Sequence, residues 1–221
     1  MKKTHPLRST LRRLFPSLSV FVKALGLVYS RRSMLRQRGY VESSKSKRPC
    51  RRDGTPLPWM NYQVIQFLEE RLNSDLSLFE YGSGTSTSFY AALVGNVVSV
   101  ETDPAWFEEV QRSMPPNVAL ELVEPMPAEA YSMLAARQDR KFDVVVVDAL
   151  HRTECLLHAP EALTDRGVVI LDDSDPSSHS PGIERLKSLG FRALLFEGLK
   201  PGSIKAYRTT VFYRDRNCLS L

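Results

Sequence analysis

The segment Phe142–Val147 constrains the fold more than any other part of the chain, because it reads Phe-Asp-Val-Val-Val-Val. Consecutive β-branched residues favour a strand, and a strand that is apolar on both faces is typical of a parallel sheet covered by helices. Shorter strand patterns precede and follow this segment, with helical patterns between them. The alternation predicts an α/β fold with right-handed crossovers and helices on both faces of the sheet.

Seven strands are expected, at residues 76–81, 97–100, 118–122, 142–147, 168–171, 191–196 and 209–213. Helices are expected at residues 60–73, 86–93, 104–114, 128–137, 154–163 and 182–189. Asp103 and Pro104 are suited to the N-cap and first position of the third helix, whereas Pro160 should distort the fifth. The last two strands have no helix between them, which predicts a terminal antiparallel hairpin.

Charge is divided sharply along the chain. Residues 1–52 contain 15 Lys or Arg and one acid, Glu42, whereas the remaining residues contain 15 basic and 24 acidic side chains. We therefore divide the chain into a helical, basic N-terminal extension with a linker, residues 1–54, and a mildly acidic domain, residues 55–221. The linker is expected at residues 43–58, which are polar and contain three prolines.

Residues 1–39 mix basic and apolar side chains, which is typical of one or two amphipathic helices. Residues 1–40 are expected to contact an anionic membrane or a protein partner, with a loosely packed solubilising arm as the alternative. The arm also suits nucleic acid phosphates, but its apolar residues do not favour that partner. Residues 14–29 are too short an apolar stretch to span a bilayer. The three cysteines are widely spaced and form no CxxC pair, which is typical of reduced thiols in the cytosol. The short apolar stretch and the reduced cysteines together predict a cytoplasmic protein with peripheral membrane contact.

The strongest chemical signal is residues 79–87, Phe-Glu-Tyr-Gly-Ser-Gly-Thr-Ser-Thr, which join the first expected strand to the next helix. Glycines in such a turn let a ligand approach the backbone, and free amides at the helix start favour a carboxylate. Glu101 ends the second strand, where a carboxylate can accept hydrogen bonds from both ribose hydroxyls. Together these features predict a nucleoside-bearing cofactor, with an ordinary tight turn and a surface Glu101 as the alternative. Thr87 occupies the position of the third glycine of a dinucleotide site, which lowers the case for NAD without removing it.

Four segments, FEYGSGTST, VVSVETDPAW, FDVVVVDALHR and GVVILDDSD, together with residues 57–62, resemble a group of small class I S-adenosylmethionine-dependent methyltransferases over residues 55–215. The resemblance implies a Rossmann-like, mostly parallel sheet of seven strands in the order 3-2-1-4-5-7-6. It also implies that S-adenosylmethionine is the cofactor, that Glu80 and residues 82–87 hold its methionine part, and that Glu101 holds its ribose. The expected cofactor-binding residues are Glu80, Tyr81, Gly82, Ser83, Gly84, Thr85, Ser86, Thr87, Glu101 and Asp148.

Asp148 ends the fourth strand, and His151 follows three residues later. Ligands of open α/β sheets bind at the carboxyl ends of the strands, so we expect Asp148 to face the methyl donor and His151 to act as a general base. The alternative is that Asp148 caps the next helix and His151 is a surface residue. Asp172 and Asp173, with Asp148, resemble the acidic trio of metal-dependent catechol-type O-methyltransferases. Asp173 departs from the usual asparagine of those enzymes, and no metal is predicted.

The predicted activity is transfer of a methyl group to an oxygen or nitrogen nucleophile. No motif indicates the acceptor, so a small molecule, lipid head group, glycan, protein or nucleic acid remains open. The alternatives to a methyltransferase are an NAD-linked oxidoreductase and a non-catalytic nucleotide-binding module tethered by the basic extension. Trp59 and Tyr62 are expected to be buried in packing, with a roof over the cofactor or substrate as the alternative. Trp106 is expected to pack its helix onto the sheet.

Overall fold

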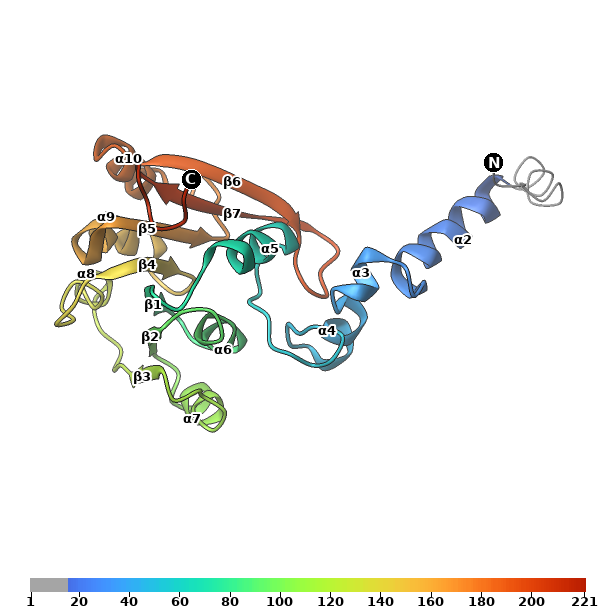
Figure 1. The fold of residues 1–221 in the computed structure, drawn as a ribbon, viewed down its shortest axis with the longest axis horizontal. Helices are drawn as coiled ribbons and strands as arrows, with labels where there is room; N and C mark the ends of the chain where they lie inside the picture. Colours follow the sequence, from blue (N-terminus) through green and yellow to red (C-terminus); the bar gives the residue numbers. More distant parts are fainter. Residues whose placement is uncertain (1–15) are drawn as a thin grey trace.

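A seven-stranded sheet in the order β3-β2-β1-β4-β5-β7-β6 forms the centre of the computed structural model, which describes residues 16–221 (Figure 1). The pairs from β3 to β5 are parallel, whereas β7 is antiparallel to both β5 and β6. The expected strand order and terminal hairpin are therefore confirmed. The strands are β1 (Ser77–Tyr81), β2 (Asn96–Glu101), β3 (Val118–Leu122), β4 (Phe142–Val147), β5 (Leu163–Asp172), β6 (Arg192–Leu199) and β7 (Ala206–Tyr213).

Helices cover both faces of this sheet, and each face has its own hydrophobic core. The first core lies between one face of the sheet and the helices α5 and α6, and it includes Val144 and Val146 of β4. The second core lies between the other face and the helices α8, α9 and α10, and it includes Val145 and Val147, which alternate with the first pair along the strand. Both faces of the central strands are thus buried, as the sequence of β4 predicts. The helices of the domain are α5 (Tyr62–Arg71), α6 (Thr85–Ala91), α7 (Pro104–Gln111), α8 (Ala128–Ser132), α9 (Arg152–Ala162) and α10 (Ser180–Ser188).

The terminal hairpin is longer than the sequence indicates. Its strands pair from Arg192 with Tyr213 to Leu199 with Ala206, so pairing continues through residues with no regular apolar alternation. Backbone hydrogen bonds to the neighbouring strand hold such residues in a strand without help from their side chains. The strand β5 is also longer than expected, because it begins at Leu163 and not at residue 168. The helix α8 is shorter than expected, because it ends at Ser132 and not at residue 137.

From residue 16 onward, the N-terminal region contains three helices, α2 (Pro16–Tyr29), α3 (Met34–Gln37) and α4 (Tyr40–Ser46). In Figure 1, α2 projects away from the sheet domain, and α4 lies between α2 and that domain. The expected linker therefore begins inside α4, and its end belongs to the core, because Leu57 is buried. The first 15 residues of the expected extension lie outside the described residues. Within residues 16–221, no helix is both long enough and apolar enough to cross a bilayer.

Candidate functional site

Residues 82–84 form a loop between β1 and α6 at the carboxyl edge of the sheet. Gly82 has a φ of +97°, and a Cβ atom at this position would lie 2.7 Å from the carbonyl oxygen of Asp148. A side chain would therefore be both conformationally strained and in steric conflict. Glycine here lets the loop pass directly against the end of β4.

Glu80 lies beneath this loop and is 1% exposed. Its Oε1 accepts a hydrogen bond from Ser86 at 2.5 Å, and its Oε2 accepts from Thr87 at 2.6 Å and from Ser99 at 3.0 Å. Burial raises the pKa of Glu80 to about 7. The amide of Gly84 donates to the Thr87 hydroxyl at 3.0 Å, which ties the loop to the same network. Glu80 and Thr87 thus shape the loop, and direct contact of either with a cofactor stays a prediction.

Tyr81 turns its side chain away from the loop and into the core, because successive residues of a strand face opposite sides. Its hydroxyl donates to the carbonyl oxygen of Ser132 at 2.5 Å. The carbonyl of Tyr81 accepts from the amide of Asp148 at 3.2 Å. Any contribution of Tyr81 to a cofactor site therefore comes from its backbone.

Glu101 ends β2 opposite this loop. Its Oε1 accepts from the amides of Thr102 and Asp103 at 2.8 and 2.9 Å, which orients the side chain. Its Oε2 accepts from the hydroxyl of Ser83 at 2.7 Å. The Ser83 hydroxyl can rotate away, whereas the two amides are fixed by the backbone. The Oε2 atom is therefore the one that a ligand hydroxyl can reach.

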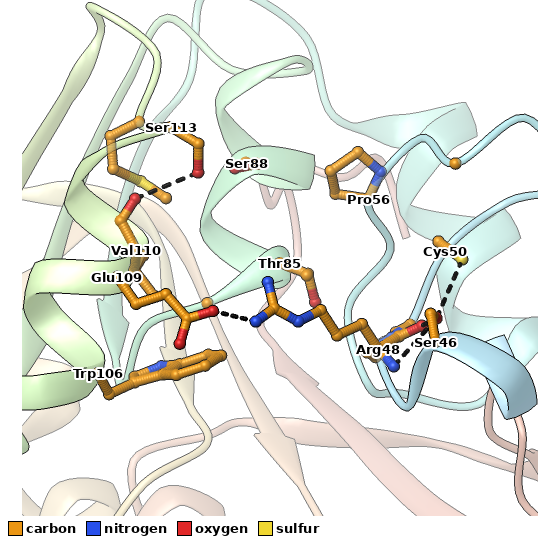
Figure 2. Close-up of a pocket in the computed structure, with 14 residues that line it drawn as sticks. Ser46, Arg48, Cys50, Pro56, Thr85, Ser88, Trp106, Glu109, Val110 and Ser113 are labelled. Atoms are coloured by element: carbon orange, nitrogen blue, oxygen red, sulfur yellow. Dashed lines mark hydrogen bonds and ion pairs between the residues drawn. The ribbon is translucent and has the colours of Figure 1, made fainter.

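Trp106 supports the loop from its outer side. Its Nε1 donates to the carbonyl oxygen of Ser83 at 2.9 Å, and its ring lies against Gly84. Trp106 thus contacts the loop, and its expected role in packing α7 onto the sheet stays a prediction. Figure 2 shows Arg48 reaching across to Glu109, with which it forms an ion pair, and its guanidinium lies 5.9 Å from the Trp106 ring centroid. A cavity of about 330 Å³ separates residues 46–56 from α6 and α7 here.

Three carboxylates converge at the ends of β4 and β5, and two basic side chains pair with them. Arg152 lies 2.9 Å from Oδ1 of Asp148. Lys200 donates to Asp172 at 2.6 Å and to Asp173 at 2.7 Å. Burial lowers the pKa of Lys200, but the two carboxylates raise it more, so this ammonium stays charged. Within residues 16–221, no three His, Cys, Asp or Glu side chains are grouped as a metal ion would require.

A cavity of about 450 Å³ opens over these carboxylates. Trp59 lies at this cavity with 53% of its surface exposed, so the expectation that it is buried is wrong. Tyr62, by contrast, is buried as expected. The lining residues are Trp59, Asp148, Asp172, Asp173, Lys200, Gly202, Ser203 and Tyr207.

Asp148 and His151 have different surroundings. Burial raises the pKa of Asp148 to about 7, and the negative charge of Asp172 contributes to the same increase. His151 lies exposed at the start of α9, with a φ of +55°, and its ring faces Tyr131 at a centroid distance of 5.9 Å. It does not line the cavity that contains Asp148. A role of His151 as the base stays a prediction.

Several solved structures resemble this arrangement. A precorrin-6y C5,15-methyltransferase from Geobacter metallireducens aligns with a TM-score of 0.53 and 16% identity, over 69% of this chain and 87% of that one. An rRNA methylase from Streptococcus thermophilus aligns with a TM-score of 0.51 and 16% identity, over 69% and 95%. The chain has the class I methyltransferase fold.

A spermidine synthase from Thermotoga maritima also shares this methyltransferase fold, with a TM-score of 0.52 and 15% identity over 69% of this chain. The chain spans only 56% of that synthase. No family model and no curated protein matches the sequence. At these identities the likeness establishes the fold alone.

Proposed function

We propose that the chain is an S-adenosylmethionine-dependent methyltransferase. The observation that carries this proposal is the Glu101 carboxylate, which two amides orient so that Oε2 meets only a rotatable serine hydroxyl. A ribose diol can take the place of that hydroxyl, and hydrogen bonds to a carboxylate are strong. Gly82 shapes the loop beside this carboxylate, because a Cβ atom there would lie 2.7 Å from the carbonyl oxygen of Asp148. Glu101 would hold the ribose, and residues 82–87 the methionine part.

The chemistry divides between the cofactor and Asp148. When bound, S-adenosylmethionine would supply an electrophilic methyl group to the acceptor nucleophile and would leave as S-adenosylhomocysteine. Asp148 accepts the proton that the nucleophile loses. A base whose pKa is about 7 is well matched to this task near neutral pH. Asp148 is preferred to His151 as the base because Asp148 lines the cavity.

The cavity over Asp148 is proposed as the acceptor site, and its chemistry favours a nitrogen nucleophile. Three aspartates and one lysine line it, and Arg152 pairs with one of the aspartates, so its net charge is −1 when all are ionised. The hydrogen bonds of Lys200 are directed to Asp172 and Asp173, and its ammonium lies 4.7 Å from the ring centroid of Tyr207. The site therefore offers mainly hydrogen-bond acceptors and aromatic surface, which suit an amine that is cationic before it loses its proton.

Calorimetry with S-adenosylmethionine, S-adenosylhomocysteine and NAD tests the cofactor assignment. Both adenosyl compounds are expected to bind and NAD is not. Binding of NAD without binding of either adenosyl compound would overturn the proposal in favour of an oxidoreductase.

Turnover is tested separately, by incubating the protein with a labelled methyl donor and fractionated cell extracts. Label is expected in amine-containing fractions, and Asp148→Asn should abolish the transfer. Donor binding without label in any fraction would favour the non-catalytic nucleotide-binding module.

A further inference from the structure

Helix α2 presents apolar side chains to solvent around most of its circumference. Seven large apolar residues among its 14 are between 44% and 65% exposed, and none of its residues is buried. Isolated exposed apolar residues are ordinary, but a contiguous group of this kind marks an interaction surface. These seven residues, which we term the apolar surface of α2, are Leu18, Val20, Phe21, Val22, Leu25, Leu27 and Tyr29.

The apolar surface of α2 has a defined centre. At 3.6 residues per turn, Leu18, Phe21 and Leu25 lie close together on one side, whereas Lys23 lies on the opposite side, roughly 160° around the helix from Leu25. The apolar arc spans roughly 220° of the circumference. An arc this wide exceeds the narrow seam through which two helices pair.

Basic side chains adjoin this apolar surface. Lys23 is exposed on the opposite side of α2, and Arg31 and Arg32 are exposed just beyond its last residue. Acidic residues are absent from residues 16–41. A second copy of the chain would bring like charges together, whereas anionic lipid head groups would attract them.

We propose that α2 lies in the head-group region of an anionic lipid bilayer, with Phe21 and Leu25 directed toward the acyl chains and Lys23 toward the aqueous side. Apolar area and attraction to anionic lipid together set the strength of such binding. Because α2 projects from the sheet domain in Figure 1, it can lie on a membrane without unfolding the domain. This proposal does not depend on the activity of the domain.

Vesicle flotation with the full-length protein tests the proposal. Vesicles of phosphatidylcholine mixed with phosphatidylglycerol are expected to bind at least about 30-fold more tightly than vesicles of phosphatidylcholine alone, because Arg31 and Arg32 each favour anionic lipid by about 1 kcal/mol. Raising the salt concentration should reduce this difference. Replacing Arg31 and Arg32 together by glutamate should also reduce it.

The apolar contribution is tested by a variant that combines Phe21→Asp with Leu25→Asp. Its binding to mixed vesicles should fall by at least roughly tenfold, since two charged groups would enter the acyl region. The matched control is Leu195→Asp, which adds an acid at an exposed apolar site on β6 and should bind like the wild type. Unchanged thermal unfolding midpoints would show that the variants are folded.

Two outcomes would overturn the proposal. One is equal vesicle binding by the wild type and the Phe21→Asp, Leu25→Asp variant. The other is no vesicle binding by the wild type, together with a dimer in analytical ultracentrifugation that the same variant converts to a monomer. In the second case, the apolar surface of α2 would be an interface between two copies of the chain.

Discussion

Replacing Glu101 by glutamine is the most direct perturbation of the proposed cofactor site. The substitution keeps the size of the side chain but exchanges one oxygen for an amide nitrogen and removes the charge. Oε1 accepts from the amides of Thr102 and Asp103, so the new nitrogen is expected at the position of Oε2, next to Ser83. The position that should accept from ribose would then carry hydrogen-bond donors.

The magnitude follows from the loss of one charge-assisted hydrogen bond. Hydrogen bonds to charged groups contribute about 1.5–3 kcal/mol, which corresponds to an increase of about 10- to 150-fold in the dissociation constant. Stability should change little, because the Ser83 hydroxyl can reverse its direction and accept from the new amide. Glu101→Ala removes the partner of two backbone amides as well, so it should weaken binding at least as much and lower the stability.

Isothermal titration calorimetry with S-adenosylhomocysteine measures the effect without turnover. The control is Glu108→Gln, which makes the same change of charge at an exposed position on α7 and should bind normally. If both Glu101 variants bound S-adenosylhomocysteine as tightly as the wild type, the ribose assignment would be refuted, and the argument for this cofactor would lose its main support.

Three other predictions concern neighbouring groups. Because the pKa of Asp148 is raised to about 7, its ionised fraction grows as the pH rises; methyl transfer should increase about tenfold per pH unit below 7 and level off above it, and Asp148→Asn should abolish this profile. Trp106→Phe removes the hydrogen bond to Ser83 and should weaken cofactor binding roughly fivefold in the same calorimetric assay. Lys200→Met should lower the free energy of unfolding in urea by about 3–5 kcal/mol, because two carboxylates lose their cation; adding Asp172→Asn should restore part of it.

The sequence predicts the frame of the molecule because the frame depends on local patterns. The β-branched run of β4 and the alternation of strands and helices are sufficient for an α/β sheet. The strand order came from the resemblance, and the structure confirms it. The loop after β1 and Glu101 were also found from sequence, since a glycine turn and an acid after the next strand have a fixed spacing.

The remaining parts of the candidate site depend on contacts between distant segments. Lys200 is 28 residues after Asp172 and follows β6, and the hairpin brings its ammonium back to the end of β5. Neither its residue type nor its neighbours in sequence indicate this contact. Trp59 was expected to be buried because large aromatic residues usually are, but it lies exposed at the cavity. Such placements follow from tertiary packing, which periodicity does not describe.

The charge of the acidic cluster shows how far its resemblance to metal-dependent O-methyltransferases extends. Two aspartates and an asparagine, the set expected of those enzymes, carry a charge of −2 before metal binding. Asp148, Asp172 and Asp173 carry −3 when all three are ionised, but Lys200 between the last two and Arg152 beside Asp148 add two positive charges, so the cluster totals −1. The extra negative charge of aspartate in place of asparagine is thus offset by cations of the chain itself. A divalent cation bound by Asp172 and Asp173 would have to displace Lys200 from two hydrogen bonds, one of them to a carboxylate that is 1% exposed. Removing that ammonium without supplying a cation would leave buried charges unpaired, and the loss of stability expected for Lys200→Met follows from this.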